Sequence, residues 1–181
     1  MNNVLYPATL RSLLIDLSVL EVYQARWTNA IHDEWIRNLL AHRPDLNPAS
    51  LQRTRALMDQ AVDDALITDY EPLIETLSLP DPDDRHVLAA AIHGETEWVV
   101  TQNVRDFPLE VLAPWGIRTV HPDAFLQEVL LSHPGQVVEA LRRSRHRYRS
   151  PPITAQEMLT SLAWQGLPET VQALAALADQ F

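Results

Sequence analysis

Apolar residues recur every three or four positions along most of the chain, which is the spacing of one face of an α-helix. Asn47-Pro48 and Thr28-Asn29 are typical helix starts, and Gly94 is a typical helix end. The pattern predicts helices over roughly 8–20, 29–42, 48–62, 71–77, 83–93, 122–132, 134–148, 154–164 and 167–179. The chain is therefore expected to be mainly helical.

Two short segments, 98–101 and 116–120, are apolar almost throughout, as expected for buried strands of a parallel sheet. Brief extended pieces are also predicted at 22–27 and 67–68. Strands that alternate with helices predict an α/β fold with a small parallel β-sheet flanked by helices. From Pro134 onward the pattern is helical only. We therefore expect an α/β domain over 1–132 and an all-helical C-terminal extension over 133–181.

Composition narrows the class of protein. The 181 residues are 46% apolar with a mean hydropathy of −0.13, which is typical of a globular protein of one domain with a small appendage. No apolar run is long enough to span a bilayer, and no signal peptide is recognisable, so we expect a cytoplasmic protein with no membrane partner. The absence of cysteine leaves only oxygen or imidazole ligands for a metal, and carboxylates favour Mg²⁺ or Mn²⁺.

The net charge of −10 is unevenly distributed. Thirteen acidic residues lie between Asp59 and Glu110, against only two basic ones, whereas the segment 142–149 holds five arginines and no acid. All basic residues are Arg, which would suit bidentate phosphate contacts, although codon bias explains the preference more simply. The charge pattern thus separates an acidic centre from a basic C-terminal segment.

Three aspartates, Asp81, Asp83 and Asp84, stand immediately before an apolar helix. Helix capping explains one or two of them, because carboxylates accept hydrogen bonds from the free N–H groups of a helix start. A third acid at the same place needs a cation nearby. We therefore interpret Asp81 and Asp83 as turn and cap residues and Asp84 as a candidate metal ligand.

Polar residues also follow the predicted strand 98–101. Thr101, Asn103 and Asp106 come at its carboxyl end, where open parallel sheets bind their ligands. An ordinary loop with side-chain turns is the alternative for these residues. Glu34 lies near the apolar face of its helix, and an exposed helical glutamate is its simpler interpretation.

The segments Leu-Pro-Asp-Pro-Asp-Asp-Arg-His-Val-Leu-Ala-Ala-Ala and Val-Thr-Gln-Asn-Val-Arg-Asp-Phe-Pro resemble the PIN-domain nucleases, and among them the VapC-like toxins. The opening Asn-Val-Leu-Tyr-Pro and the Ile-His-Asp-Glu-Trp helix fit the same group. The resemblance covers about residues 1–130. It implies a Mg²⁺- or Mn²⁺-dependent single-strand endoribonuclease that is the toxin of a type II toxin–antitoxin pair. RNA is the implied substrate, an antitoxin the implied partner, and a homodimer the implied assembly.

Carried over by position, the resemblance assigns Glu34, Asp84 and Asp106 as metal ligands and catalytic residues, with Thr101 and Asn103 beside them. The family's first acid falls on Met1, and the strand that would precede it is not in this sequence. A start upstream of the given one, a degenerate enzyme, and strand supply by another chain all stay open, and we favour the first. If the strand and acid are truly missing, weak metal binding and little nuclease activity are expected. The alternative function is an inactive PIN-fold module that binds protein or RNA.

The basic segment has three possible uses. Arg142, Arg143, Arg145, Arg147 and Arg149 are interpreted as RNA-binding residues, with Tyr148 available for stacking on a base. A solvated helix end, whose basic side chains stabilise the last turn, is the alternative interpretation. Docking of an acidic antitoxin segment is the third.

Overall fold

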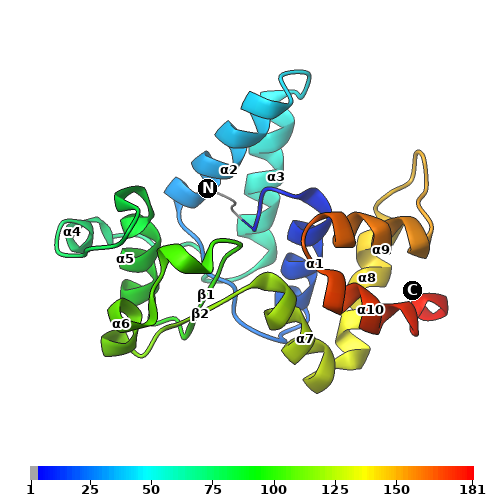
Figure 1. The fold of residues 1–181 in the computed structure, drawn as a ribbon. Coiled ribbons are helices and arrows are strands. Elements are labelled where there is room, and N and C mark those ends of the chain that lie inside the picture. The colour runs from blue at the N-terminus through cyan, green and yellow to red at the C-terminus, as the bar shows by residue number, and fades with distance from the viewer. Residues whose placement is uncertain (1–3) are drawn as a thin grey trace. The chain divides into compact units, whose positions relative to one another are not determined.

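The structure of the protein is a computed structural model that describes residues 4–181 (Figure 1). Contacts divide the chain into two compact units. The first holds residues 25–121 together with the described residues up to Tyr6, and the second holds Pro7–Gln24 and Pro122–Phe181. The second unit is thus built from both ends of the chain, whereas the sequence predicts a boundary at 132/133. The predicted domain boundary at 132/133 stays a prediction.

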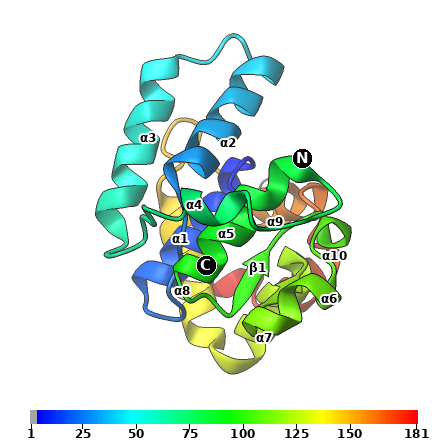
Figure 2. The same ribbon diagram turned by 90° about the vertical axis from the view of Figure 1, so that its left-hand side faces the viewer.

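The first unit contains seven helices and strands and three short 3₁₀ turns among its described residues. Its helices and strands are α2 (Asn29–His42), α3 (Pro48–Ala61), α4 (Glu71–Ile74), α5 (Arg85–His93), β1 (Trp98–Val100), α6 (Leu109–Leu112) and β2 (Arg118–Val120). The helices α2 and α3 run antiparallel as a hairpin (Figure 2). Their starts match the sequence signals, because Thr28 Oγ1 accepts from the Ile31 N–H and Asn47 Oδ1 accepts from the Ala49 N–H.

The two strands β1 and β2 form a parallel sheet, with Trp98 opposite Arg118 and Val100 opposite Val120. Helix α5 packs against β1, and α6 packs against β2. The buried core between these elements includes Leu88, Val99, Leu112 and Ile117. The predicted α/β fold with a small parallel sheet is therefore confirmed. Because the strands are parallel, their carboxyl ends lie at one edge of the sheet.

The predicted extended piece at 22–27 forms less structure than expected. Only Trp27 pairs, as an isolated parallel bridge with Leu66. The Trp27 N–H donates to the Ala65 carbonyl over 2.9 Å, and the Ile67 N–H donates to the Trp27 carbonyl over 2.8 Å. The following Thr28 already caps α2, so the extended segment has no room to continue.

Gly94, at the end of α5, leaves room for a neighbouring side chain. A Cβ atom at this position would lie 2.5 Å from Ile67 Cδ1. Its φ of −82° is accessible to any residue. Close approach of a neighbouring side chain, and not backbone conformation, therefore explains this glycine.

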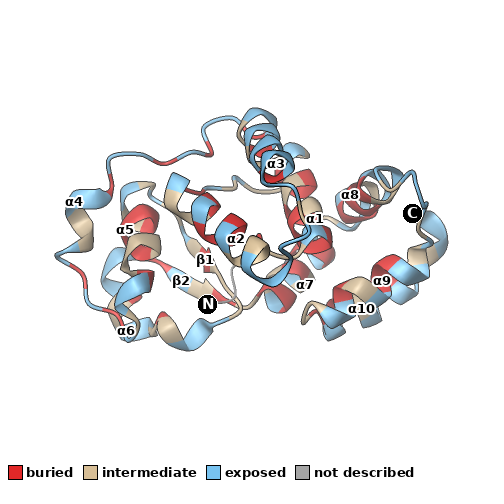
Figure 3. Ribbon diagram, turned by 90° about the horizontal axis from the view of Figure 1, so that it is seen from above, coloured by how far each residue is buried: buried red, intermediate tan, exposed pale blue. Residues whose placement is uncertain are grey.

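Among its described residues, the second unit contains helices and loops but no strand. It comprises α1 (Ala8–Val19), α7 (Pro122–Ser132), α8 (Pro134–His146), α9 (Ala155–Trp164) and α10 (Pro168–Ala175). Helix α1 packs against α8 and α9, and α10 packs against α7 and α9. Buried and exposed positions alternate along α9 and α10, as expected for helices that cover a core with one face (Figure 3).

Three helices end at least two residues earlier than predicted, and the same backbone feature follows each of them. The predicted helices 71–77, 134–148 and 167–179 end at Ile74, His146 and Ala175. Beyond these residues the backbone forms bonds to the third preceding carbonyl, such as Thr76 N–H to Leu73 and Tyr148 N–H to Arg145. The last turns tighten in this way because the next segment leaves the helix axis.

A membrane span is not found in the part of the chain that the structure describes. None of the helices within residues 4–181 combines the length and the apolar character that crossing a bilayer demands.

Candidate metal centre

The segment before α5 folds into a 3₁₀ turn, η1 (Pro82–Asp84), that brings two aspartates together. Asp81 Oδ1 accepts from the Asp83 N–H over 2.9 Å, and the Asp81 carbonyl accepts from the Asp84 N–H over 3.2 Å. Asp83 is exposed, whereas only 2% of Asp84 is exposed. The predicted capping role of Asp81 is therefore seen, and the same turn directs Asp84 inward.

The loop after β1 supplies a third carboxylate. Thr101 Oγ1 accepts from the Asn103 N–H over 3.1 Å, and Asn103 Nδ2 donates to Asp106 Oδ2. The Asp106 N–H in turn donates to the Asn103 carbonyl over 3.2 Å, within the short turn η2 (Val104–Asp106). Thr101 and Asn103 thus order the loop that carries Asp106.

These two loops converge. Asp81, Asp84 and Asp106 each offer a carboxylate oxygen, and these oxygens all lie within 4.8 Å of one another. We call these three residues the acidic triad. Asp81 and Asp106 are half-buried, and Asp84 is buried. The triad therefore combines one buried carboxylate with two half-buried ones.

The triad is electrostatically unfavourable by itself. The pKa of Asp84 is raised to about 7, mainly by burial and to a smaller extent by the neighbouring charges of Asp81, Asp106 and Glu34. Glu34, buried on α2, is thus close enough for its charge to act on Asp84. Carboxylates held this close are stabilised by a cation between them.

The donor set fits a hard divalent cation. Every ligand atom of the triad is a carboxylate oxygen, which is the ligand type that Mg²⁺ and Mn²⁺ prefer. Mg²⁺ commonly keeps several of its waters and takes only a few carboxylates, which suits a half-open site. The arrangement can therefore hold a hydrated divalent ion beside a solvent-accessible edge of the sheet.

The structure brings most of the predicted site residues together. Asp84 and Asp106 belong to the triad, Glu34 acts on Asp84 electrostatically, and Thr101 and Asn103 shape the loop. Sequence reasoning did not count Asp81 as a ligand, although its spacing of three residues from Asp84 could have shown that one turn brings both carboxylates together. Met1, the position of the family's first acid, lies outside the described residues.

The basic segment 142–149 lies in the second unit, and several of its side chains have partners within that unit. Arg142 and Arg143 both bind Glu139, and Arg142 also donates to the Gln180 carbonyl. Arg147 forms a bidentate pair with the buried Asp16 of α1. The Tyr148 hydroxyl lies 3.3 Å from Thr9 Oγ1.

For Arg145 and Arg149 the described part of the chain provides no ion pair. These two guanidinium groups therefore differ from Arg147, which is tied to a buried carboxylate.

Comparison with known proteins identifies the family of this chain. The PIN domain family matches residues 3–105, more than half of the chain, and the VapC50 C-terminal domain family matches residues 122–176. The chain therefore belongs to the PIN-domain family, and the resemblance to its VapC-like members is confirmed.

A curated relative supports the same assignment. The protein named "Putative ribonuclease VapC50" of Mycobacterium tuberculosis is 37% identical over 82 residues, which are 45% of this chain and 48% of that protein. The chain thus spans about half of the length of the curated relative it matches. No solved structure matches the chain.

Proposed function

We propose that this protein is a Mg²⁺- or Mn²⁺-dependent endoribonuclease that cleaves single-stranded RNA in the cytoplasm. The observation that carries the proposal is the convergence of the acidic triad, with Glu34 close enough to act on Asp84. Membership of the PIN-domain family and similarity to a relative named as a ribonuclease support it.

The site residues have different proposed roles according to their position. Asp84 is the buried ligand, and Asp81 and Asp106 are the ligands at the solvent side. Asn103 holds Asp106 by donating to its Oδ2 atom, and Thr101 holds Asn103. A divalent ion, when bound, lowers the pKa of a coordinated water and offsets negative charge on the phosphate oxygens.

A nuclease assay with matched variants tests this function. Purified protein is incubated with single-stranded RNA in Mn²⁺ or in EDTA. Asp81→Ala, Asp84→Ala, Asp106→Ala and Glu34→Ala are each expected to lower the cleavage rate about a hundredfold or more, since each removes a charge from the ion's surroundings.

Asp83→Ala is the matched control, because Asp83 lies in the same acidic stretch but is exposed and outside the triad. It is expected to retain the parental rate. Equal cleavage in EDTA, or equal loss in Asp83→Ala and Asp84→Ala, would contradict the proposal. Mn²⁺-independent RNA binding without cleavage would favour the inactive RNA-binding module instead.

We further propose that the protein is the toxin of a type II toxin–antitoxin pair, acts as a homodimer and is inhibited by a cognate antitoxin. The similarity to a VapC-named relative supports this proposal. Expression in a bacterial host tests it. The parent is expected to arrest growth, Asp84→Ala is expected not to, and co-expression of the antitoxin encoded beside the gene is expected to restore growth.

Within the proposed RNA-binding segment, Arg145 and Arg149 are the side chains best placed to contact phosphate. Arg142, Arg143 and Arg147 are proposed as weaker contributors, because each already binds a carboxylate of this chain. Each phosphate contact contributes about one unit to the slope of log affinity against log salt. Replacing Arg145 and Arg149 by Gln is expected to lower that slope by about two. An unchanged slope would exclude them as phosphate contacts.

A further inference from the structure

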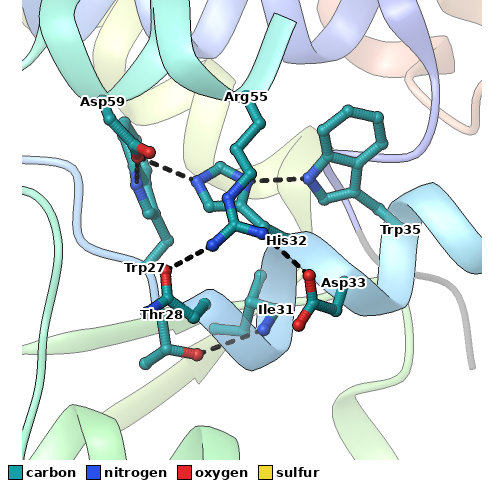
Figure 4. Close-up of polar contacts among 9 residues, drawn as sticks. Trp27, Thr28, Ile31, His32, Asp33, Trp35, Arg55 and Asp59 are labelled. Atoms are coloured by element: carbon teal, nitrogen blue, oxygen red, sulfur yellow. Dashed lines mark hydrogen bonds and ion pairs between the residues drawn. The ribbon is translucent and has the colours of Figure 1, made fainter. Parts of the chain in front are cut away.

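Helix α2, which carries Glu34, also carries His32, which is completely buried and hydrogen-bonded through both ring nitrogens (Figure 4). The Trp35 indole N–H donates to His32 Nδ1 over 3.0 Å. Nδ1 is therefore an acceptor, and the ring hydrogen must be on Nε2. His32 Nε2 lies 3.0 Å from Asp59 Oδ1 and donates to it. The contacts thus select one tautomer and one ring orientation.

The carboxylate of Asp59 connects three segments of the first unit. It accepts from His32 on α2 and, over 2.7 Å, from the indole N–H of Trp27 in the bridged segment before α2. Asp59 itself belongs to α3. We call Trp27, His32, Trp35 and Asp59 the histidine network. It joins α2 to α3 through directional bonds.

A second set of polar contacts, outside the histidine network, also joins α2 to α3. Arg55 of α3 donates to Asp33 over 2.8 Å (Figure 4). It also donates to Asn29 over 2.5 Å, and both of these residues lie on α2. Helix α2 is thus held to α3 along its first two turns by two separate polar contacts. Apolar side chains can bury the same area but cannot fix the rotation of a helix about its axis as narrowly, because their contacts are non-directional.

The rotation of α2 matters because of where Glu34 lies. Residues two positions apart on an α-helix are separated by about 200° around its axis, so His32 and Glu34 point to nearly opposite sides. Side chains extend about 5–6 Å from the axis, so a rotation of about 20° moves a carboxylate by roughly 2 Å. Ligand and catalytic groups need placement within about 0.5 Å.

We propose that His32 is a positioning residue: its bond to Asp59 of α3 fixes the rotation of α2 and thereby holds Glu34 toward the acidic triad. The bond from Trp35, which lies on the same helix, orients the imidazole for that contact. The inference rests on the proposed metal site, since Glu34 is placed for a cation bound there. His32 does not contact the ion in this scheme and acts only through the helix.

Mn²⁺ binding by the full chain, measured by titration calorimetry at a temperature where circular dichroism shows every variant folded, tests this role. His32→Leu removes both bonds and is expected to weaken Mn²⁺ binding about tenfold or more. His32→Gln is expected to restore binding to within about threefold of the parent. Its amide can accept from Trp35 and donate to Asp59, as the neutral imidazole does.

Two further variants separate positioning from loss of stability. Ile36→Ala, in the same helix but outside the histidine network, is expected to lower Tm without weakening Mn²⁺ binding, because Ile36 is buried but makes no directional bond through its side chain. Glu34→Gln is expected to weaken binding in the parent but to add little in the His32→Leu background. If His32→Leu does not fold, Asp59→Ala, which removes the partner of His32 on α3, replaces it.

The possible results are distinct. Parental Mn²⁺ affinity in His32→Leu or Asp59→Ala, or additive effects of Glu34→Gln and His32→Leu, would overturn the positioning role alone. An equal loss in Ile36→Ala and His32→Leu would show a general effect of stability and overturn it too. A parent protein that binds no Mn²⁺ would overturn the metal site and this inference together.

Discussion

The Asp84 carboxyl group links the site to the stability of the protein through pH. Its pKa in the folded state is about 7, against 3.8 for an ordinary aspartate, because it is buried among other acids. Between these values the folded protein holds a proton that the unfolded chain has released. The contribution of Asp84 to the free energy of unfolding is therefore greatest below about pH 4 and falls as the pH rises to about 7.

Urea denaturation in EDTA across this pH range measures that dependence. Asp84→Asn cannot ionise, so it is expected to lose the fall between about pH 4 and pH 7 and to be more stable than the parent at pH 8. The exposed neighbour Asp83→Asn is the control and should keep the parental pH dependence. If Asp84→Asn kept the parental dependence of stability on pH, the surroundings would not raise the pKa of the Asp84 carboxyl group.

Ser144 gives a second residue-scale prediction, in the second unit. It is 1% exposed, and its hydroxyl has no hydrogen-bond partner among the described residues. A buried polar group without a partner costs about 1–3 kcal/mol. Ser144→Ala is expected to raise the free energy of unfolding by about 1 kcal/mol, measured by thermal or urea denaturation. A lower stability in this variant would reveal a bond to buried water.

At the scale of elements, the start of α10 depends on a side chain from another helix. Asp123 of α7 is buried, and its Oδ1 accepts from the Thr170 N–H over 2.8 Å and from the Thr170 hydroxyl over 2.6 Å. Its Oδ2 accepts from the Glu169 N–H over 3.1 Å. The carboxylate thus caps α10, whose preceding residue, Leu167, provides no side-chain cap.

Asp123→Ala is therefore expected to lower the free energy of unfolding by about 2–4 kcal/mol, because it removes several charge-assisted bonds and leaves the Thr170 hydroxyl and N–H without this partner. Denaturation monitored by circular dichroism measures the loss. Thr170→Val, which removes the hydroxyl but keeps the N–H bonds, should cost about 1–2 kcal/mol. A loss in Asp123→Ala no larger than that in Thr170→Val would show that the backbone bonds contribute little.

At the scale of the molecule, the acidic triad and the histidine network lie in the first unit. A ligand stabilises only the structure whose unfolding releases it. Hydrogen exchange measured by mass spectrometry is expected to show slower exchange in α2 and α5 when Mn²⁺ is added. Exchange in α9 and α10 should change little, and Asp84→Asn should abolish the effect.

Uniform protection of both units by Mn²⁺ would contradict this expectation, because it would show that the two units open together. Protection confined to α9 and α10 would place the ion elsewhere and would count against the triad.

Much of the architecture followed from local signals. Thr28, Asn47 and Thr154 cap helices as their residue types predict, and Gly94 and the prolines mark boundaries. The strands 98–100 and 118–120 were predictable because each lies in a short, largely apolar segment between helical patterns, although Arg118 at the start of the second strand is exposed. Val22–Trp27 was predicted too long, because an extended pattern does not show whether a partner strand exists.

The sequence by itself determined the helical periodicity, the two short parallel strands, the restriction of any metal to oxygen or nitrogen ligands, and the motifs that place the chain among PIN-domain proteins. These properties depend on spacing and residue chemistry within one segment. Tertiary structure alone decided that Asp106 joins Asp81 and Asp84, that Arg147 binds Asp16, and that α1 packs with the C-terminal helices. Such contacts join residues far apart in the chain, and their geometry is set by how whole elements pack.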